Sequence, residues 1–76
     1  MNNEDRKKIN EISNLINQAL EMITELSESH QERIDNMAEN LQGSERYQIM
    51  EEKQNSLDNI RDSLESMESD IQEAIE

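Results

Sequence analysis

The chain has 76 residues, 19 of them acidic and 7 basic, so its formal charge is −12; it contains no cysteine, proline or tryptophan. This charge repels phosphate backbones and anionic lipids, so direct binding of nucleic acid or of a membrane is disfavoured, whereas a protein with a basic surface is a favoured partner. The absence of cysteine excludes disulfides and thiolate metal sites, and a core this small rarely stabilises a fold by more than ~3–5 kcal/mol without a disulfide, a metal or a second subunit.

The first 41 residues predict one long amphipathic helix. Apolar side chains recur there with a period close to 3.6 residues. They are Ile9, Ile12, Ile16, Leu20, Ile23, Leu26, Ile34, Met37 and Leu41. Asn3 is the expected N-cap, and the acidic residues at 4 and 5 suit the positive end of the helix dipole. We therefore expect a helix over about 4–41, with a weak point at 35–39, where Asn36 could cap a new turn.

His30 is the only histidine and falls on the apolar stripe of this helix, where Lys53 of the second helix is expected to arrive. No second histidine, cysteine or Glu-x-x-His spacing accompanies it. A polar layer that fixes helix register is therefore favoured over a ligand or general-base role. Di-iron motifs, calcium loops, nucleophile–base pairs and phosphate-binding glycine loops are also missing. We expect no enzymatic activity, no cofactor and no metal ion.

Residues 42–44 predict a tight turn, and residues 45–76 predict a second helix. Gly43 is the expected left-handed stop of the first helix, and Ser44 the expected cap of the second. The second helix has the 3/4 alternation typical of a coiled-coil seam. The expected seam is Met50, Lys53, Leu57, Ile60, Leu64, Met67, Ile71 and Ala74.

Two helices of similar length joined by a short turn predict an all-α fold: an antiparallel two-helix hairpin, coiled-coil-like, in one domain over residues 1–76. Opposite charges are expected to meet at its open end. The residues concerned are Arg6, Lys7 and Lys8 of the first helix and Asp70, Glu73 and Glu76 of the second.

The apolar stripe of the first helix is wider than one partner helix can cover, since its arc spans roughly 160° at about 100° per residue. One flank carries Leu15, Ala19, Met22 and Leu26, and the other carries Leu20. A second surface must bury the first flank. Homodimerisation into a four-helix bundle is the favoured explanation, and a groove for a foreign helix is the alternative.

The second helix also carries a ridge of carboxylates that we expect opposite its seam: Asp58, Asp62, Glu65, Glu73 and Glu76. A solvated face is the ordinary explanation of such a ridge. The functional explanation is a docking site for a basic protein that normally holds nucleic acid, whose phosphates the carboxylates would imitate.

The segment 35–47, DNMAENLQGSERY, resembles the inter-helix segment of small acidic proteins encoded by phages and mobile elements of Gram-positive bacteria, with a looser likeness through residues 57–60. Those proteins often carry proline at the position of Ala38. The resemblance implies phage biology, in which small proteins of this build often block a host enzyme or a nucleic-acid-targeting defence complex. It brings no site residues with it.

These observations together predict a non-enzymatic, acidic protein-interaction module. No apolar run approaches the ~20 residues of a membrane span and the N-terminus lacks a signal-peptide pattern, so a cytoplasmic location is expected, in a bacterial host if the chain is phage-encoded. The most specific expectation is an inhibitor of a host nucleic-acid-handling or anti-phage defence protein. The alternatives are a structural or assembly role and a bundle that sequesters a small anionic ligand. The ligand-sequestering bundle is disfavoured because an anionic ligand needs converging cations and few lie near the middle of the chain: Arg33, Arg46, Lys53 and Arg61.

Overall fold

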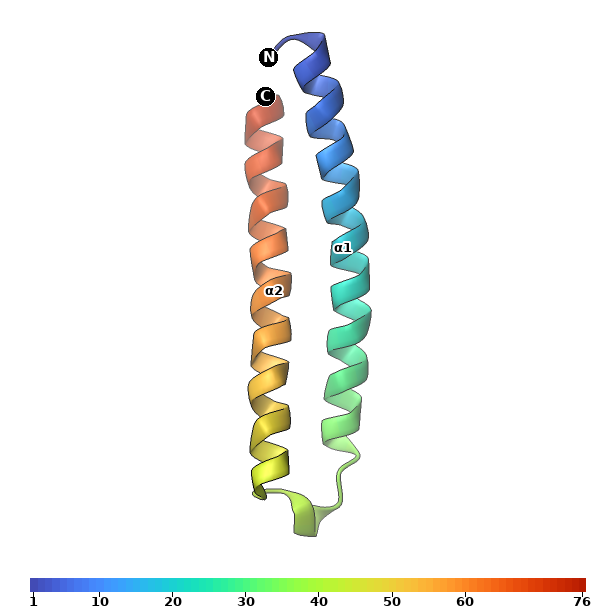
Figure 1. Cartoon of the computed structure of the whole chain (residues 1–76), viewed down its shortest axis with the longest axis vertical. Coiled ribbons are helices and arrows are strands. Elements are labelled where there is room, and N and C mark those ends of the chain that lie inside the picture. The colour runs from blue at the N-terminus through green and yellow to red at the C-terminus, as the bar shows by residue number, and fades with distance from the viewer.

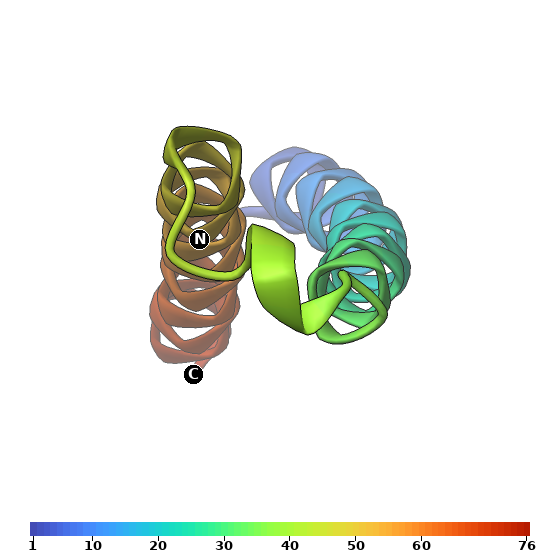
Figure 2. The ribbon, with the colours of Figure 1, turned by 90° about the horizontal axis from the view of Figure 1, so that it is seen from below.

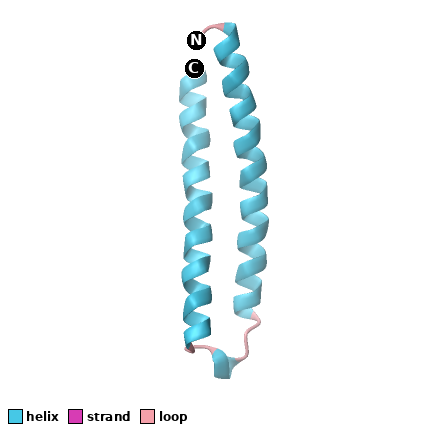
Figure 3. Cartoon of the chain, viewed as in Figure 1, coloured by secondary structure: helices cyan, strands magenta, loops and turns pink.

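The structure, a computed structural model that describes residues 1–76, is a pair of long antiparallel helices (Figure 1). Helix α1 covers Asn3–Asp35, the short 3-10 helix η1 covers Glu39–Leu41, and α2 covers Glu45–Ile75. No strand is present (Figure 3). The Cα atoms extend over 59 × 14 × 13 Å, and both chain ends lie at the end of the rod opposite the connection (Figure 1). The predicted all-α antiparallel hairpin is confirmed.

Helix α1 is capped by Asn2 rather than by the predicted Asn3. The backbone of Asn2 is extended (φ −78°, ψ 175°), so its Oδ1 accepts a hydrogen bond from the Asp5 backbone N–H at 2.8 Å. Glu4 and Asp5 lie in the first turn, as expected. The amide oxygen satisfies one free N–H group, and the two carboxylates suit the positive end of the helix dipole.

Helix α1 ends at Asp35, so the predicted continuation to Leu41 is wrong. Asn36 is the C-cap, and the Met37 N–H donates to the Ile34 carbonyl at 3.1 Å, which tightens the last turn. The backbone of Ala38 is extended, with φ −59° and ψ 143°, so the helix cannot continue through this residue. The break falls at the predicted weak point, where Asn36 has a low helix propensity.

A single turn of 3-10 helix and a left-handed glycine connect α1 to α2 (Figure 2). Gly43 has φ 87°, the only positive φ in the chain. Ser44 caps α2, since its Oγ accepts a hydrogen bond from the Tyr47 backbone N–H at 3.2 Å. The predicted left-handed conformation of Gly43 and the Ser44 cap are confirmed, but Gly43 follows η1 and does not end the first helix, so the predicted tight turn over 42–44 is wrong.

The helices face each other along two seams with 4/3 spacing. The α1 seam is Ile9, Ser13, Ile16, Leu20, Ile23, Ser27, His30 and Ile34. The α2 seam is Met50, Gln54, Leu57, Arg61, Leu64, Glu68, Ile71 and Ile75. Half of the α2 prediction is therefore right. The other half is wrong, because Lys53, Ile60, Met67 and Ala74 are exposed and the residue after each takes its place.

The polar side chains in the α1 seam explain this rotation of α2. Four polar pairs cross the interface: Ser13 with Glu68, Ser27 with Asp58, Ser27 with Gln54, and His30 with Gln54. Burying such groups without partners is costly. Turning α2 so that its polar side chains meet them satisfies the hydrogen bonds, and it leaves Ile60 and Met67 each 48% exposed.

The apolar core is thin. Only three apolar side chains are buried, Ile23, Ile34 and Ile71, and the other three buried residues are polar. Nine large apolar side chains remain exposed. Neither helix is both long enough and apolar enough to cross a membrane. A lone hairpin of this size buries little of the apolar surface that stabilises small folds.

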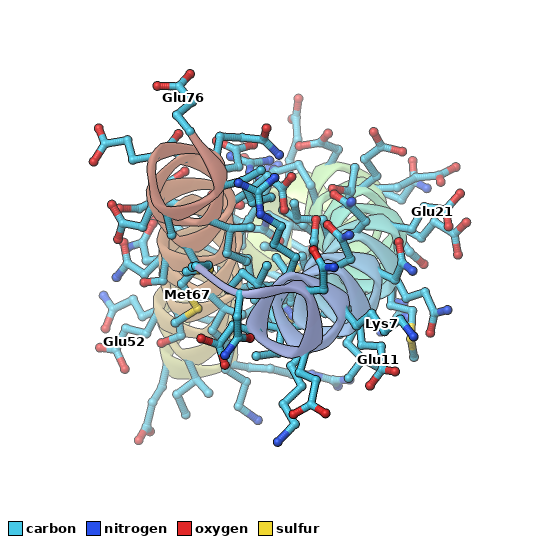
Figure 4. All side chains as sticks on the ribbon, turned by 90° about the horizontal axis from the view of Figure 1, so that it is seen from above. Lys7, Glu11, Glu21, Glu52, Met67 and Glu76 are labelled. Carbon is cyan, nitrogen blue, oxygen red and sulfur yellow. The ribbon has the colours of Figure 1, made fainter.

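The expected charge pairing at the open end is wrong. No ion pair joins the basic start of α1 to the acidic end of α2, and the only ion pairs link Arg61 to Asp58 at 3.9 Å and to Asp62 at 4.0 Å. Lys7 points away from α2 (Figure 4). The long side chains of exposed lysines gain little from such a pairing and keep their hydration instead.

The connection yields a test of its backbone geometry. Replacing Gly43 with alanine should lower the free energy of unfolding by about 1–2 kcal/mol, because a β-carbon disfavours a left-handed backbone. Such a β-carbon would meet no atom within 4 Å, so the loss would come from the backbone alone. Urea unfolding at one fixed protein concentration measures it. Gly43→Asn should lose less, since asparagine tolerates this conformation; equal losses for both variants would contradict the explanation.

Candidate functional site

A polar layer, buried except for the Asp58 carboxylate, joins the helices in the half of the hairpin nearer the connection. It consists of Ser27 and His30 from α1 and Gln54 and Asp58 from α2. Gln54 Nε2 donates to Ser27 Oγ at 2.9 Å, to the Ser27 carbonyl at 3.2 Å and to Asp58 Oδ1 at 3.1 Å. Ser27 Oγ donates to the same Asp58 oxygen at 2.7 Å. His30 Nδ1 lies 2.7 Å from Gln54 Oε1, and because an amide oxygen only accepts, Nδ1 is the donor.

The layer has the composition of a structural contact. The predicted polar layer at His30 is present, although Gln54 and not Lys53 reaches the imidazole. No buried side-chain nitrogen or oxygen in the chain lacks a hydrogen-bond partner, and no three His, Cys, Asp or Glu side chains gather in a way that could hold a metal ion. A fully satisfied polar network of this kind fixes the register and rotation of two helices.

The rotation of α2 leaves an apolar face on one side of the hairpin, with residues from both helices. We define the apolar face as Ile12, Leu15, Ala19, Met22, Leu26, Ile60 and Met67. The most exposed are Met22 at 70% and Leu15 at 63%. An open groove of about 490 Å³ lies in this face, lined by Ala19, Met22, Ile23, Leu26, Ile60 and Leu64. All six lining side chains are apolar, so the groove suits an apolar partner surface.

All four residues predicted for a dimer interface lie on the apolar face: Leu15, Ala19, Met22 and Leu26. The structure adds Ile60 and Met67, which sequence reasoning missed because it assigned them to the seam between the two helices. Their apolar spacing was visible in the sequence. Only the orientation of α2 shows that these two side chains face away from α1.

The opposite side of the hairpin forms an acidic face. We define the acidic face as Glu21, Glu25, Glu28, Glu32, Asp35, Glu51, Asp62, Glu65 and Glu76. One groove there, of about 400 Å³, is lined by eight polar or charged residues, among them Glu28, Glu32 and Asp35. Met67 and Glu76 point to opposite sides of α2 (Figure 4). The hairpin as a whole is therefore amphipathic, apolar on one side and acidic on the other.

The carboxylate ridge predicted on α2 is only partly exposed. The side chains of Asp62, Glu65, Glu73 and Glu76 reach solvent. Asp58 does not lie opposite the seam as predicted, because the rotation of α2 brings it into the polar layer. Its side chain is still 39% exposed, but the carboxylate already accepts hydrogen bonds from Ser27 and Gln54 and pairs with Arg61, so it is a poorer candidate for contact with a partner than the other four. Binding by the other four stays a prediction.

A basic cluster lies at the connection end, on the same side as the apolar face. We define the basic cluster as Arg33, Arg46 and Lys53. These three line a groove of about 570 Å³ together with His30, Glu45, Ile49 and Met50. Arg61, the fourth central cation, lies on the other side with Asp58. Three of the four central cations therefore converge, although the sequence alone indicated too few cations for an anion site. Their groove is open and also contains Glu45.

Tyr47, the only aromatic residue, lines a groove on the acidic side of the hairpin. A hydrogen bond to the Glu51 carboxylate raises the pKa of Tyr47 above its ordinary value of 10.0, and loss of hydration and the negative charges of Glu51 and Asp35 act in the same direction. Each cause penalises the phenolate. The phenol therefore adds no further negative charge to the acidic face at neutral pH.

The polar layer yields a second test. Gln54→Ala should lower the free energy of unfolding by about 1–3 kcal/mol, because it removes the amide shared by three residues and leaves the buried His30 Nδ1 without its partner. Asn55→Ala is the matched control, since Asn55 is exposed and its side chain makes no hydrogen bond within the chain; it should change stability by less than about 0.5 kcal/mol. Equal urea midpoints for both variants would show that the layer contributes nothing.

Comparisons of the chain with protein-family models, with curated protein sequences and with solved structures found no match. The resemblance of residues 35–47 to phage-encoded proteins therefore stays an expectation from the sequence. Evidence about function comes from the two opposite faces of the hairpin.

Proposed function

We propose that this chain is a non-enzymatic protein-interaction module, which self-associates through its apolar face and presents its acidic face to a protein with a basic surface. The observation that supports this most is the placement of the two faces on opposite sides of one hairpin. Two copies that cover each other's apolar face leave both acidic faces outside. Self-association and partner binding are then compatible.

The thin core supports self-association. The chain buries three apolar side chains, while apolar residues of both helices meet around the open groove of the apolar face. Contiguous apolar surface of this kind usually marks a protein interface. Packing two such faces together gives a four-helix bundle, and a second subunit supplies the stability that a small chain without disulfides or metal needs.

The charge distribution supports a basic partner. Acidic residues outnumber basic ones by 19 to 7, and the only arginine on the acidic side, Arg61, is paired with Asp58 and Asp62. Uniform negative potential attracts a basic surface and increases the rate of encounter with it. Nucleic acid is repelled by the same field.

A protein that handles nucleic acid is the partner that this chemistry fits best. Its basic cleft normally binds phosphates, and carboxylates spaced along a 59 Å rod can occupy it in their place. Together with the likeness of residues 35–47 to phage proteins, this leads us to propose inhibition of a host nucleic-acid-handling or anti-phage defence protein, in the bacterial cytoplasm. The elongated shape also suits a structural or assembly role, which oligomers larger than a dimer would favour.

Self-association is tested by light scattering. The unmodified chain should have twice the monomer mass, and Leu15→Glu combined with Met22→Glu should give monomers, because two carboxylates would face their symmetry mates across a desolvated interface. Leu41→Glu is the matched control, since Leu41 is exposed but lies in η1, outside the apolar face. Circular dichroism should show that all three chains remain helical. A monomer mass for the unmodified chain would eliminate the dimer.

The acidic face is tested with a partner recovered by pull-down from bacterial lysate. Asp62→Asn with Glu65→Gln should weaken binding several-fold, and added salt should weaken binding of the unmodified chain in the same way. The control is Glu39→Gln with Glu52→Gln, which removes the same charge from exposed positions outside the acidic face and should have a smaller effect. Asp58 is left unchanged because it belongs to the polar layer. Equal affinities and a flat salt response would exclude the acidic face as the contact.

A further inference from the structure

The apolar face is not uniform along the rod. Residues seven apart lie on one side of a helix in a seam of this spacing. One such column on α1 reads Asp5, Ile12, Ala19, Leu26, Arg33. The column begins with an acid, ends with a base and is apolar between them. On α2 the matching column begins with Arg46 and Lys53, continues with Ile60 and Met67, and ends at Ala74.

We propose that two copies cover each other's apolar face in antiparallel orientation, with the connection of each lying against the open end of the other. This rests on the proposed self-association and specifies its geometry. In this arrangement α1 packs on the partner's α1 and α2 on the partner's α2. Arg33 then meets the partner's Asp5, and Lys53 meets the acidic last turns of the partner's α2, which carry Asp70.

The spacing along α1 supports a twofold axis at Ala19. Asp5 and Arg33 are each 14 residues from Ala19, or about 21 Å at ~1.5 Å per residue. Ile12 and Leu26 are each 7 residues from it. A twofold axis at Ala19 therefore pairs Asp5 with the partner's Arg33 and Ile12 with the partner's Leu26. Such reciprocal pairing is what an isologous interface requires. The small alanine side chain at the centre lets the helices approach closely.

The α2 column is centred at the same level of the rod. Ile60 and Met67 lie on either side of Leu64, and a twofold axis between them pairs each with the other. The polar contacts between the helices fix the relative level of α1 and α2, since Ser13 meets Glu68 and Ser27 meets Asp58. Ala19 lies between the two serines, and the midpoint of Ile60 and Met67 lies between the two carboxylates. One axis therefore serves both helices.

Charge opposes the alternative orientation. In a parallel dimer the twofold axis runs along the rod, so the two basic clusters would lie side by side across the interface, at the same level. Three cations facing three cations repel each other. In the antiparallel dimer Arg46 and Lys53 instead face the end of the partner's α2, where no basic residue follows Arg61, and Arg33 meets Asp5 beside the basic residues 6–8 of the partner's α1.

Charge reversal distinguishes the two orientations by the sign of its effect. Arg33→Glu should raise the dimer dissociation constant about tenfold at low ionic strength, as should Asp5→Arg, and the two changes combined should restore it. In a parallel dimer Arg33→Glu would face the partner's Lys53 and tighten the dimer instead. Lys7→Glu is the matched control: it changes the net charge equally but lies off the apolar face, pointing away from α2 (Figure 4). Restoration by the double change excludes a general loss of helix stability.

A distance measurement tests the orientation without altering the interface. The chain has no cysteine, so Asn40→Cys, in the exposed connection, accepts a single nitroxide label. The two labels of an antiparallel dimer should lie about 60 Å apart, from twice the ~30 Å between the connection and the axis. Labels within about 25 Å of each other in a dimer would overturn the antiparallel orientation but not self-association. A monomer mass would overturn self-association itself and leave the apolar face to a foreign helix.

Discussion

The hydrogen-bonded layer of Ser27, His30, Gln54 and Asp58 determines the arrangement of the rest of the hairpin. Apolar packing alone would place the most apolar side of α2 against α1. The buried serine and histidine of α1 instead require polar partners, because leaving them unsatisfied costs more than leaving two apolar side chains partly exposed. Rotation of α2 supplies Gln54 and Asp58 to these groups. The same rotation turns apolar side chains of α2 outward, onto the side where α1 already exposes its own.

The distribution of residues over the surface follows from that rotation. The apolar face combines a flank of α1 with the displaced side of α2, and the acidic face occupies the other side of the rod. Neither face belongs to one helix. The hairpin satisfies its polar contacts by leaving apolar side chains of α2 exposed, and these add to the apolar surface of α1. We propose that a second copy covers this surface.

Net charge has different consequences at the two faces. On the acidic face nearly all cations are absent, and the single arginine there is paired. On the apolar side the cations gather at one end of the rod. In α2 the bases Arg46 and Lys53 lie near the connection and no base follows Arg61, so this helix has a charge polarity along its length, and that polarity favours one orientation of a dimer without requiring a large contribution from any single ion pair.

The sequence by itself determined the fold class, the two helices, the left-handed Gly43, the Ser44 cap and the weak point near Asn36, because each depends on local backbone preferences and on the helical period. It also indicated the apolar flank of α1, since that flank follows from the sequence of one helix. Only the tertiary structure decided which side of α2 faces α1. Lys53, Ile60 and Met67 fit a seam by spacing as well as Gln54, Arg61 and Glu68 do, and polar contacts between residues 24 to 55 positions apart selected the second set. The place of Asp58 in the polar layer, the α2 half of the apolar face and the convergence of the basic cluster all depend on that choice.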